Sequence, residues 1–240
     1  MHLSRVIREV YIYMFYDETK TINACDEDPT LVFDILKEDL IELLDKILSR
    51  KQFDYSVTDE KGDDIMMKLL KKGKYEVVLN HMKDKRWNVN HQNNNGDTFA
   101  HILVSLDYSK VMEIIKALMK NKEFTPNIRN NEGETILDKA VNNAHIYTTT
   151  KILEDERFDS VGVFSFMKLY DTFIKSNNYG KYTKLTNLEM IVDNLDKKDI
   201  APQVKEIIVN IKNNFGIIKE EVLTNKTDSI DYIVNASIAA

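Results

Sequence analysis

The sequence is poor in the residues that cross-link a chain or break its helices. Its 240 residues include one cysteine, Cys25, together with seven glycines, three prolines and one tryptophan. A single cysteine excludes an internal disulfide, so the fold must depend on a packed core, which a chain of this length can build. We therefore expect a soluble protein of a reducing compartment, in the cytoplasm.

Long apolar stretches are also missing. No run approaches the roughly 18 residues that a membrane helix needs. The first residues, MHLSRVIREVYIYMFYDE, lack the apolar block and small-residue cleavage site of a signal peptide. The net charge of −6 argues against general nucleic-acid binding, which needs clustered Lys and Arg. We expect no membrane and no nucleic acid among the partners.

Catalytic patterns are absent too. The five histidines have no metal-ligand spacing with one another or with Cys25. The sequence contains no glycine-rich phosphate loop and no G-x-S-x-G motif. Acidic pairs such as Glu38–Asp39 and Asp63–Asp64 fall at polar helix ends or turns, where a solvated surface explains them. We expect no catalytic residue, no metal, no cofactor and no small-molecule substrate.

Charge is distributed unevenly. Residues 17–45 are mostly acidic, whereas residues 68–86 are basic. Two interpretations stay open: two solvated faces of opposite sign, or one charged docking surface.

A repeat organises the middle of the chain. Three polar turns end in glycine, SVTDEKG at Gly62, NHQNNNG at Gly96 and NIRNNEG at Gly133, and the glycines are 34 and 37 residues apart. Each glycine precedes a first short helix (65–70, 99–106, 136–141) and then a second (75–82, 110–119, 146–153). An aromatic residue stands nine places before each glycine: Phe53, Trp87 and Phe124. Such a period predicts stacked units, none of which buries its apolar face alone.

These residues resemble the ankyrin repeat. The best copy, Gly96-Asp97-Thr98-Phe99-Ala100-His101-Ile102-Leu103, parallels the family pattern G-x-T-P-L-H-x-A. The glycine would supply a left-handed turn, Thr98 would cap the first helix, and His101 would bond back to the turn. The motif at Gly133 has Asp138 in place of the histidine, and the motif at Gly62 lacks both Thr and His. The family's proline is absent from all three motifs. Divergent, Asn-rich members of this kind occur in giant DNA viruses and protists, so the host cytoplasm or a virion is the implied location if the source is viral.

The resemblance implies an all-α ankyrin-repeat solenoid over residues 29–159, with 29–53 as its N-terminal cap. Residues 1–28 are predicted to be helical from the face Val6, Ile7, Val10, Tyr11, Met14 and Phe15; a strand over 10–16 is the alternative. Residues 160–240 have helical patterns at 163–175, 185–195, 204–211 and 217–223, with a loop at 176–180 and a helix start at Pro202. They form a helical cap over the last repeat, or a separate interaction module.

The resemblance further implies a non-catalytic scaffold or adaptor that binds a partner protein through a concave polar face. Carried over position by position, that face comprises Glu60, Lys61, Asp63, Lys71, Lys72, Asn94, Asn95, Asp97, Ser105, Asn131, Glu132, Glu134, Asn142 and Asn143. Because all are polar, the face suits a polar protein surface or exposed backbone. We expect joint truncation of Asn94, Asn95, Asn131 and Asn143 to abolish binding and leave folding intact. The alternative is a structural subunit of a larger assembly, such as a virion, that uses the convex face or the C-terminal helices.

Overall fold

A computed structural model describes residues 18–106, 108–158, 160–161, 163–175, 179–197, 199–200, 202–224 and 228–239. This part of the chain is mostly helical, which confirms the all-α class in its coarse form. No helix within these ranges is long and apolar enough to cross a membrane. The predicted helical face from Val6 to Phe15 lies outside the described residues, as does most of the loop predicted at 176–180.

Short helices come in pairs, as the repeat predicts. After α2 (Glu18–Glu27), the pairs are α3 (Leu31–Lys37) with α4 (Ile41–Leu48), α5 (Ile65–Lys71) with α6 (Tyr75–His81), α7 (Phe99–Leu103) with α8 (Tyr108–Lys120), and α9 (Ile136–Asn142) with α10 (Ile146–Glu154). The expected helix at 99–106 therefore ends three residues early. The five other helices expected within the repeats agree with the structure to within two residues.

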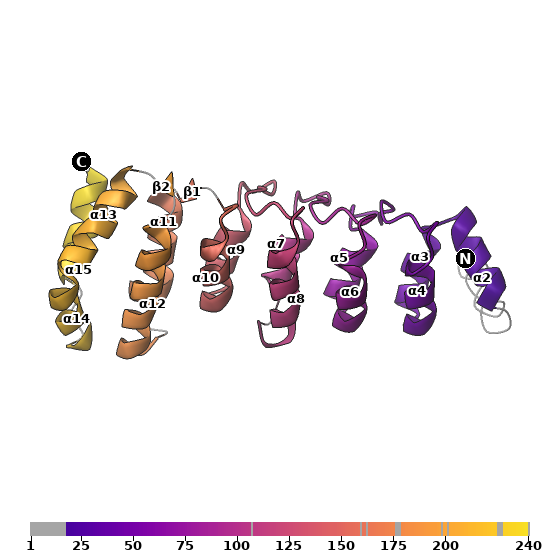
Figure 1. The fold of residues 1–240 in the computed structure, drawn as a ribbon, viewed down its shortest axis with the longest axis horizontal. Coiled ribbons are helices and arrows are strands. Elements are labelled where there is room, and N and C mark those ends of the chain that lie inside the picture. The colour runs from indigo at the N-terminus through magenta and orange to yellow at the C-terminus, as the bar shows by residue number, and fades with distance from the viewer. Residues whose placement is uncertain are drawn as a thin grey trace.

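The helices pack in two rows. Each first helix contacts the next first helix, so that α3, α5, α7 and α9 form one row, while α6, α8 and α10 form the other. Both rows are visible in Figure 1, in which the turns that carry the glycines project along one edge. Every unit thus buries its apolar side against its neighbours. In α5, for example, all residues except the two lysines are fully buried.

The rows continue beyond residue 159. They pass into α11 (Val163–Tyr170), which contacts α9, and α12 (Lys181–Leu195), which contacts α10; a π-helical turn (Asp171–Lys175) follows α11. Then come α13 (Pro202–Asn213), α14 (Phe215–Leu223) and α15 (Asp228–Ala239). Two-residue strands, β1 (Ser160–Val161) and β2 (Asp199–Ile200), pair in parallel beside these helices. The helical patterns and the start at Pro202 were predicted, but α15 and the strand pair were not.

Buried aromatic side chains pack at the junctions between units. Phe53, Trp87, Phe124 and Phe158 are each at most 6% exposed. The ring of Trp87 meets that of Phe99, in the next unit, edge to face with centroids 5.0 Å apart. Its indole N–H donates to Asp64 over 2.9 Å. The aromatic residue nine places before Gly96 thus packs between two units, with Phe99 as its ring partner.

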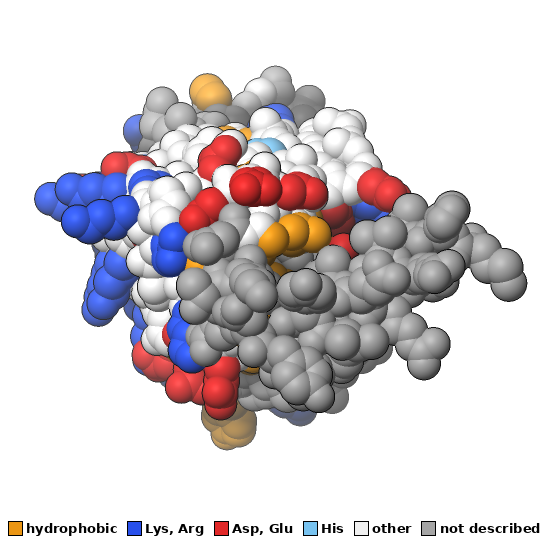
Figure 2. Space-filling view, turned by 90° about the vertical axis from the view of Figure 1, so that its right-hand side faces the viewer, with side chains coloured by type: hydrophobic (Ala, Val, Ile, Leu, Met, Phe, Trp, Pro, Cys, Tyr) orange, Lys and Arg blue, Asp and Glu red, His pale blue; other side chains and the backbone are white. Residues whose placement is uncertain are grey.

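The two oppositely charged segments meet at the first junction. Lys74 forms an ion pair with Asp39, and His81 lies 2.9 Å from Asp45. Seen from the α2 end, acidic side chains gather in the upper half of the surface, and lysine and arginine side chains gather along the left edge (Figure 2). Part of the acidic and basic charge is thus paired within the molecule.

Candidate functional site

The candidate site is the edge formed by the three turns, 59–63 (turn 1), 93–97 (turn 2) and 130–134 (turn 3). In each turn the side-chain oxygen of the first residue accepts two backbone N–H groups, at distances of 2.9 to 3.0 Å. These first residues are Asp59, Asn93 and Asn130. Asp and Asn favour such positions because their short side chains can take the place of a backbone acceptor.

The glycines have the positive φ that the sequence predicts. φ is 72° at Gly62, 71° at Gly96 and 77° at Gly133. The first two also lie close to the following turn: a Cβ on Gly62 would be 2.5 Å from Oδ1 of Asn94, and one on Gly96 would be 2.5 Å from Oδ1 of Asn131. A Cβ on Gly133 would meet nothing within 4 Å. At Gly62 and Gly96, glycine is therefore required both for the positive φ and for the close approach of the next turn. At Gly133 it is required for the positive φ alone.

Hydrogen bonds join each turn to the next, an arrangement that we call the turn ladder. The backbone N–H of Asn94 donates to the carbonyl of Lys61, and that of Asn131 to the carbonyl of Asn95, both over 3.0 Å. The side-chain amide of Asn94 donates to the carbonyl of Glu60 over 3.0 Å. That of Asn131 donates to the carbonyl of Asn94 over 2.9 Å. The exposed edge is thus fastened by its own asparagines.

Capping residues follow directly after turns 2 and 3, at the starts of α7 and α9. Thr98 and His101 form a reciprocal cap at the start of α7, and Thr135 and Asp138 form the same cap at α9. The predicted roles of Thr98 and His101 are confirmed. The other ring nitrogen of His101, Nε2, donates to the carbonyl of Glu134 in turn 3 over 3.0 Å. This bond ties α7 to the following unit.

Burial shifts the pKa of two residues at helix starts, His101 and Asp64. It lowers the pKa of His101, whose Nδ1 accepts from the backbone N–H of Thr98 over 3.1 Å. At the corresponding start of α5, burial raises the pKa of Asp64. Hydrogen bonds from Met67 and Trp87 lower it, but by less than burial raises it. Both groups serve the packing of the units.

Most of the fourteen predicted face residues have polar groups engaged within the chain. Asp97 accepts from Asn130 and pairs with Lys139; Glu134 accepts from Asn142. Residues that donate to backbone carbonyls are Asn94, Ser105, Asn131 and Asn143. Among the described residues, none bonds to the side chains of Glu60, Lys61, Lys72, Asn95 and Glu132, all of which are exposed.

Asp63 differs from the expectation of an exposed surface residue. Its side chain is 1% exposed, and its carboxylate accepts from Lys71 over 2.6 Å and from Asn93 over 2.8 Å. The residue after the glycine points into the ladder, where its charge is paired. The side chain of Lys71 is 38% exposed, and its ammonium group forms the ion pair with Asp63.

Several residues with structural roles were missed. The residues that close the turns, Asp59, Asn93 and Asn130, could have been found because each stands three places before a glycine. Arg86 and Arg157, which bind backbone carbonyls of the preceding unit, also have a signal. Each follows an aspartate by two residues and directly precedes an aromatic residue.

One set of side chains resembles a catalytic relay. His81 lies 2.9 Å from both Oδ1 of Asp45 and the hydroxyl of Tyr55. The pKa of Tyr55 is raised, mainly by burial. Asp45 belongs to α4, His81 to α6 and Tyr55 to the segment between α4 and α5, so these contacts join two neighbouring units. The described residues hold no group of three or more His, Cys, Asp or Glu that could bind a metal.

Comparison with known proteins adds no further assignment: no protein-family model, curated protein or solved structure matches this chain. The geometry of the turn edge is what characterises the site. It offers exposed polar groups on a fastened edge, without a reactive group among them.

Proposed function

We propose that the chain is a divergent ankyrin-repeat protein that acts as a non-catalytic scaffold or adaptor and binds a partner protein through its polar face. The motif from Gly96 to Leu103 supports the family assignment, together with paired helices in two rows. The lone Cys25 suits a reducing compartment, so we propose the cytoplasm as the location.

The observation that carries the binding proposal is the contrast within the turn ladder. The ladder holds the turns in place, and four exposed side chains on these turns have no partner among the described residues: Glu60, Lys61, Asn95 and Glu132, here called the tip residues. A polar surface held rigidly before binding loses little conformational entropy when a partner docks. The tip residues are therefore the best candidates for contacts with a polar partner surface.

Affinity capture with matched variants tests this proposal. The full chain is used as bait in cells that produce it, beside a variant with all four tip residues changed to Ala. A control variant carries Glu76→Ala, Asn80→Ala and Glu156→Ala, which are exposed positions outside the turns. We expect the tip variant to melt like the parent and lose the partner, while the control keeps it. Equal recovery with parent and tip variant would refute the proposed face.

A second candidate, a structural subunit of a larger assembly, has one observation in its favour. The exposed large hydrophobic side chains of the described residues all lie in the C-terminal helices: Tyr182, Val209, Ile217 and Tyr232. Apolar groups in such positions suit an assembly contact. Sedimentation decides between the two candidates, because a subunit would co-sediment stoichiometrically with a large particle and an adaptor would not.

A further inference from the structure

Two arginines fill equivalent places between units. Nη1 of Arg86 donates to the carbonyls of Lys51 and Phe53, over 2.8 and 3.2 Å, and its guanidinium lies 5.2 Å from the ring centroid of Tyr55. Arg157 donates to the carbonyls of Met119 and Phe124, over 2.8 and 2.9 Å, and lies 5.4 Å from the ring centroid of Phe124. Each arginine thus binds carbonyls at or just beyond the C-terminal end of the preceding second helix and covers an aromatic ring.

At the junction between these two, the arginine is replaced by Glu123. The register is fixed by a shared turn, in which the backbone N–H of Arg86, Glu123 and Arg157 donates to the side chain two residues earlier. By this register, the residues that an arginine would contact here are Met82, Asp84, Lys85 and Trp87. A carboxylate has no proton to donate to their carbonyls.

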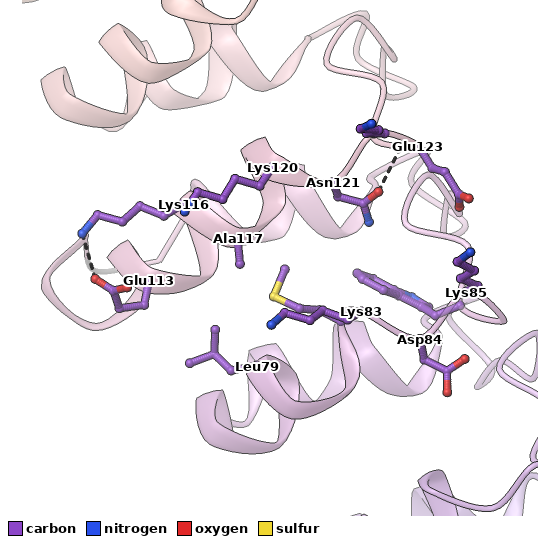
Figure 3. A pocket seen from close by; sticks show the side chains of 13 residues that line it. Leu79, Lys83, Asp84, Lys85, Glu113, Lys116, Ala117, Lys120, Asn121 and Glu123 are labelled. Atoms are coloured by element: carbon purple, nitrogen blue, oxygen red, sulfur yellow. Dashed lines mark hydrogen bonds and ion pairs between the residues drawn. The ribbon is translucent and has the colours of Figure 1, made fainter.

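A pocket of about 760 Å³ lies at this place, and all four of those residues line it. Leu79 of α6 and Ala117 of α8 face each other across it, Lys83 lies between the two helices in this view, and Asn121 lies just beyond the end of α8 (Figure 3). The pocket therefore coincides with the missing arginine.

Charge around the pocket is mixed and largely unpaired. Asp84 is occupied by Arg86, and Glu113 by Lys116. Within the described ranges no carboxylate pairs with the four remaining lysines that line the pocket, Lys83, Lys85, Lys120 and Lys122. None of the described cations pairs with Glu123. An occupant that satisfies this arrangement carries several negative charges and one positive group.

We propose that this pocket binds an acidic segment of a partner protein that inserts one arginine. The guanidinium takes the place held at the neighbouring junctions by Arg86 and Arg157, above Trp87 and beside Glu123, and donates to the equivalent backbone carbonyls. The flanking acidic residues pair with the four lysines. This site lies between second helices, away from the turns, and is independent of the proposed polar face.

The chain contains a natural probe for this pocket. Residues 154–158, EDERF, carry the arginine that fills the corresponding place at α8, with three acidic residues before it. The test peptide is EDERF with blocked ends, titrated into the full-length protein. Because Trp87 is the only tryptophan and lines the pocket, its fluorescence reports occupancy of this site.

We expect a saturable change in Trp87 fluorescence with EDERF. Replacing the peptide's arginine by glutamine, or its acidic residues by their amides, should weaken binding by about tenfold or more, the loss expected for charged hydrogen bonds. Glu123→Arg, which supplies the guanidinium from within the chain, should remove binding and leave the fold intact by circular dichroism. The tip variant should bind the peptide like the parent, so failure here and failure of the polar face are distinguishable.

Three results would overturn the proposal. One is the absence of a saturable change in the parent. Another is equal binding of the glutamine peptide, which would show that the pocket recognises only acidic charge. The third is tighter binding of a single-stranded oligonucleotide than of EDERF, which would make the pocket an anion site for nucleic acid.

Discussion

The side-chain amide of Asn131 donates to the backbone carbonyl of Asn94 over 2.9 Å, and the amide of Asn94 donates in the same way to the carbonyl of Glu60. The asparagines that make the turns look like a binding surface therefore also hold the turns to one another. This relationship changes what their replacement should do.

Asn94→Ala and Asn131→Ala should each destabilise the fold. Each removes a bond between turns and leaves a carbonyl to water, so we expect a loss of about 0.5 to 1.5 kcal/mol per site. Urea unfolding followed by circular dichroism measures this loss, with Asn95→Ala as the matched control because its side chain has no partner among the described residues. The joint truncation expected from sequence to leave folding intact should thus lower stability. Equal midpoints for Asn94→Ala and Asn95→Ala would contradict the ladder.

The glycines should separate into two classes. Gly133→Ala meets no neighbour, so it should cost only about 1 kcal/mol for the positive φ. Gly96→Ala adds a Cβ 2.7 Å from the backbone nitrogen of Asn131, so its cost should be higher, about 2 to 3 kcal/mol. Thermal melts of the two variants provide the comparison. A Gly133→Ala protein less stable than Gly96→Ala would show that the turns are not stacked as described.

Substitutions at the junction positions Glu123 and Arg157 should change the stability of the fold in opposite directions. Glu123→Arg should raise the free energy of unfolding by about 1 kcal/mol, because a guanidinium can donate to carbonyls that the carboxylate cannot. Arg157→Met should lower it by a similar amount or more, since it leaves the carbonyls at the end of α8 without their donor. Chemical denaturation of both variants tests the pair. A destabilised Glu123→Arg protein would mean that the pocket does not match the neighbouring junctions.

His101 should make stability depend on pH. Burial lowers its pKa in the folded state, whereas the unfolded chain takes up a proton near the ordinary value of 6.5. Below that value the unfolded state binds more protons than the folded state, so stability is lost as pH falls and is fully present above it. Asp97, Glu134 and Lys139 also influence this ring. The urea midpoint of the parent should therefore fall more between about pH 7.5 and 5.5 than that of His101→Gln. If the urea midpoints of the parent and of His101→Gln fall equally over this pH range, the pH dependence belongs to other groups.

Sequence analysis predicted the features that depend on residues close together in the chain. Glycine at a positive φ, Thr at a helix start and apolar residues at helical spacing each leave a local signal, and these signals located the turns and most of the paired helices. The inward position of Asp63 has no such signal, because burial depends on how the preceding and following turns stack. Its ion pair with Lys71, eight residues later, becomes visible only in the folded chain.

Beyond residue 159 the repeat could not be followed from sequence, although the rows of helices continue. The units there lack a glycine turn that matches Gly62, Gly96 and Gly133, and β1 and β2 join segments 39 residues apart. α15 was missed although Ile230 and Val234, both buried, are four residues apart and so have helical spacing. The pocket could not be predicted because it depends on the absence of one side chain from a place that tertiary packing defines.

Amide hydrogen exchange tests the turn ladder most directly. Glu60, Asn94 and Asn131 occupy the same position, two residues before each glycine, on an exposed edge. The N–H of Asn94 and of Asn131 donates to the preceding turn, whereas in the described part of the chain the N–H of Glu60 has no acceptor. Slow exchange at Asn94 and Asn131, with fast exchange at Glu60, is the predicted result. Equally fast exchange at all three would show that the turns are not fastened, and would remove the rigid surface on which the proposed binding depends.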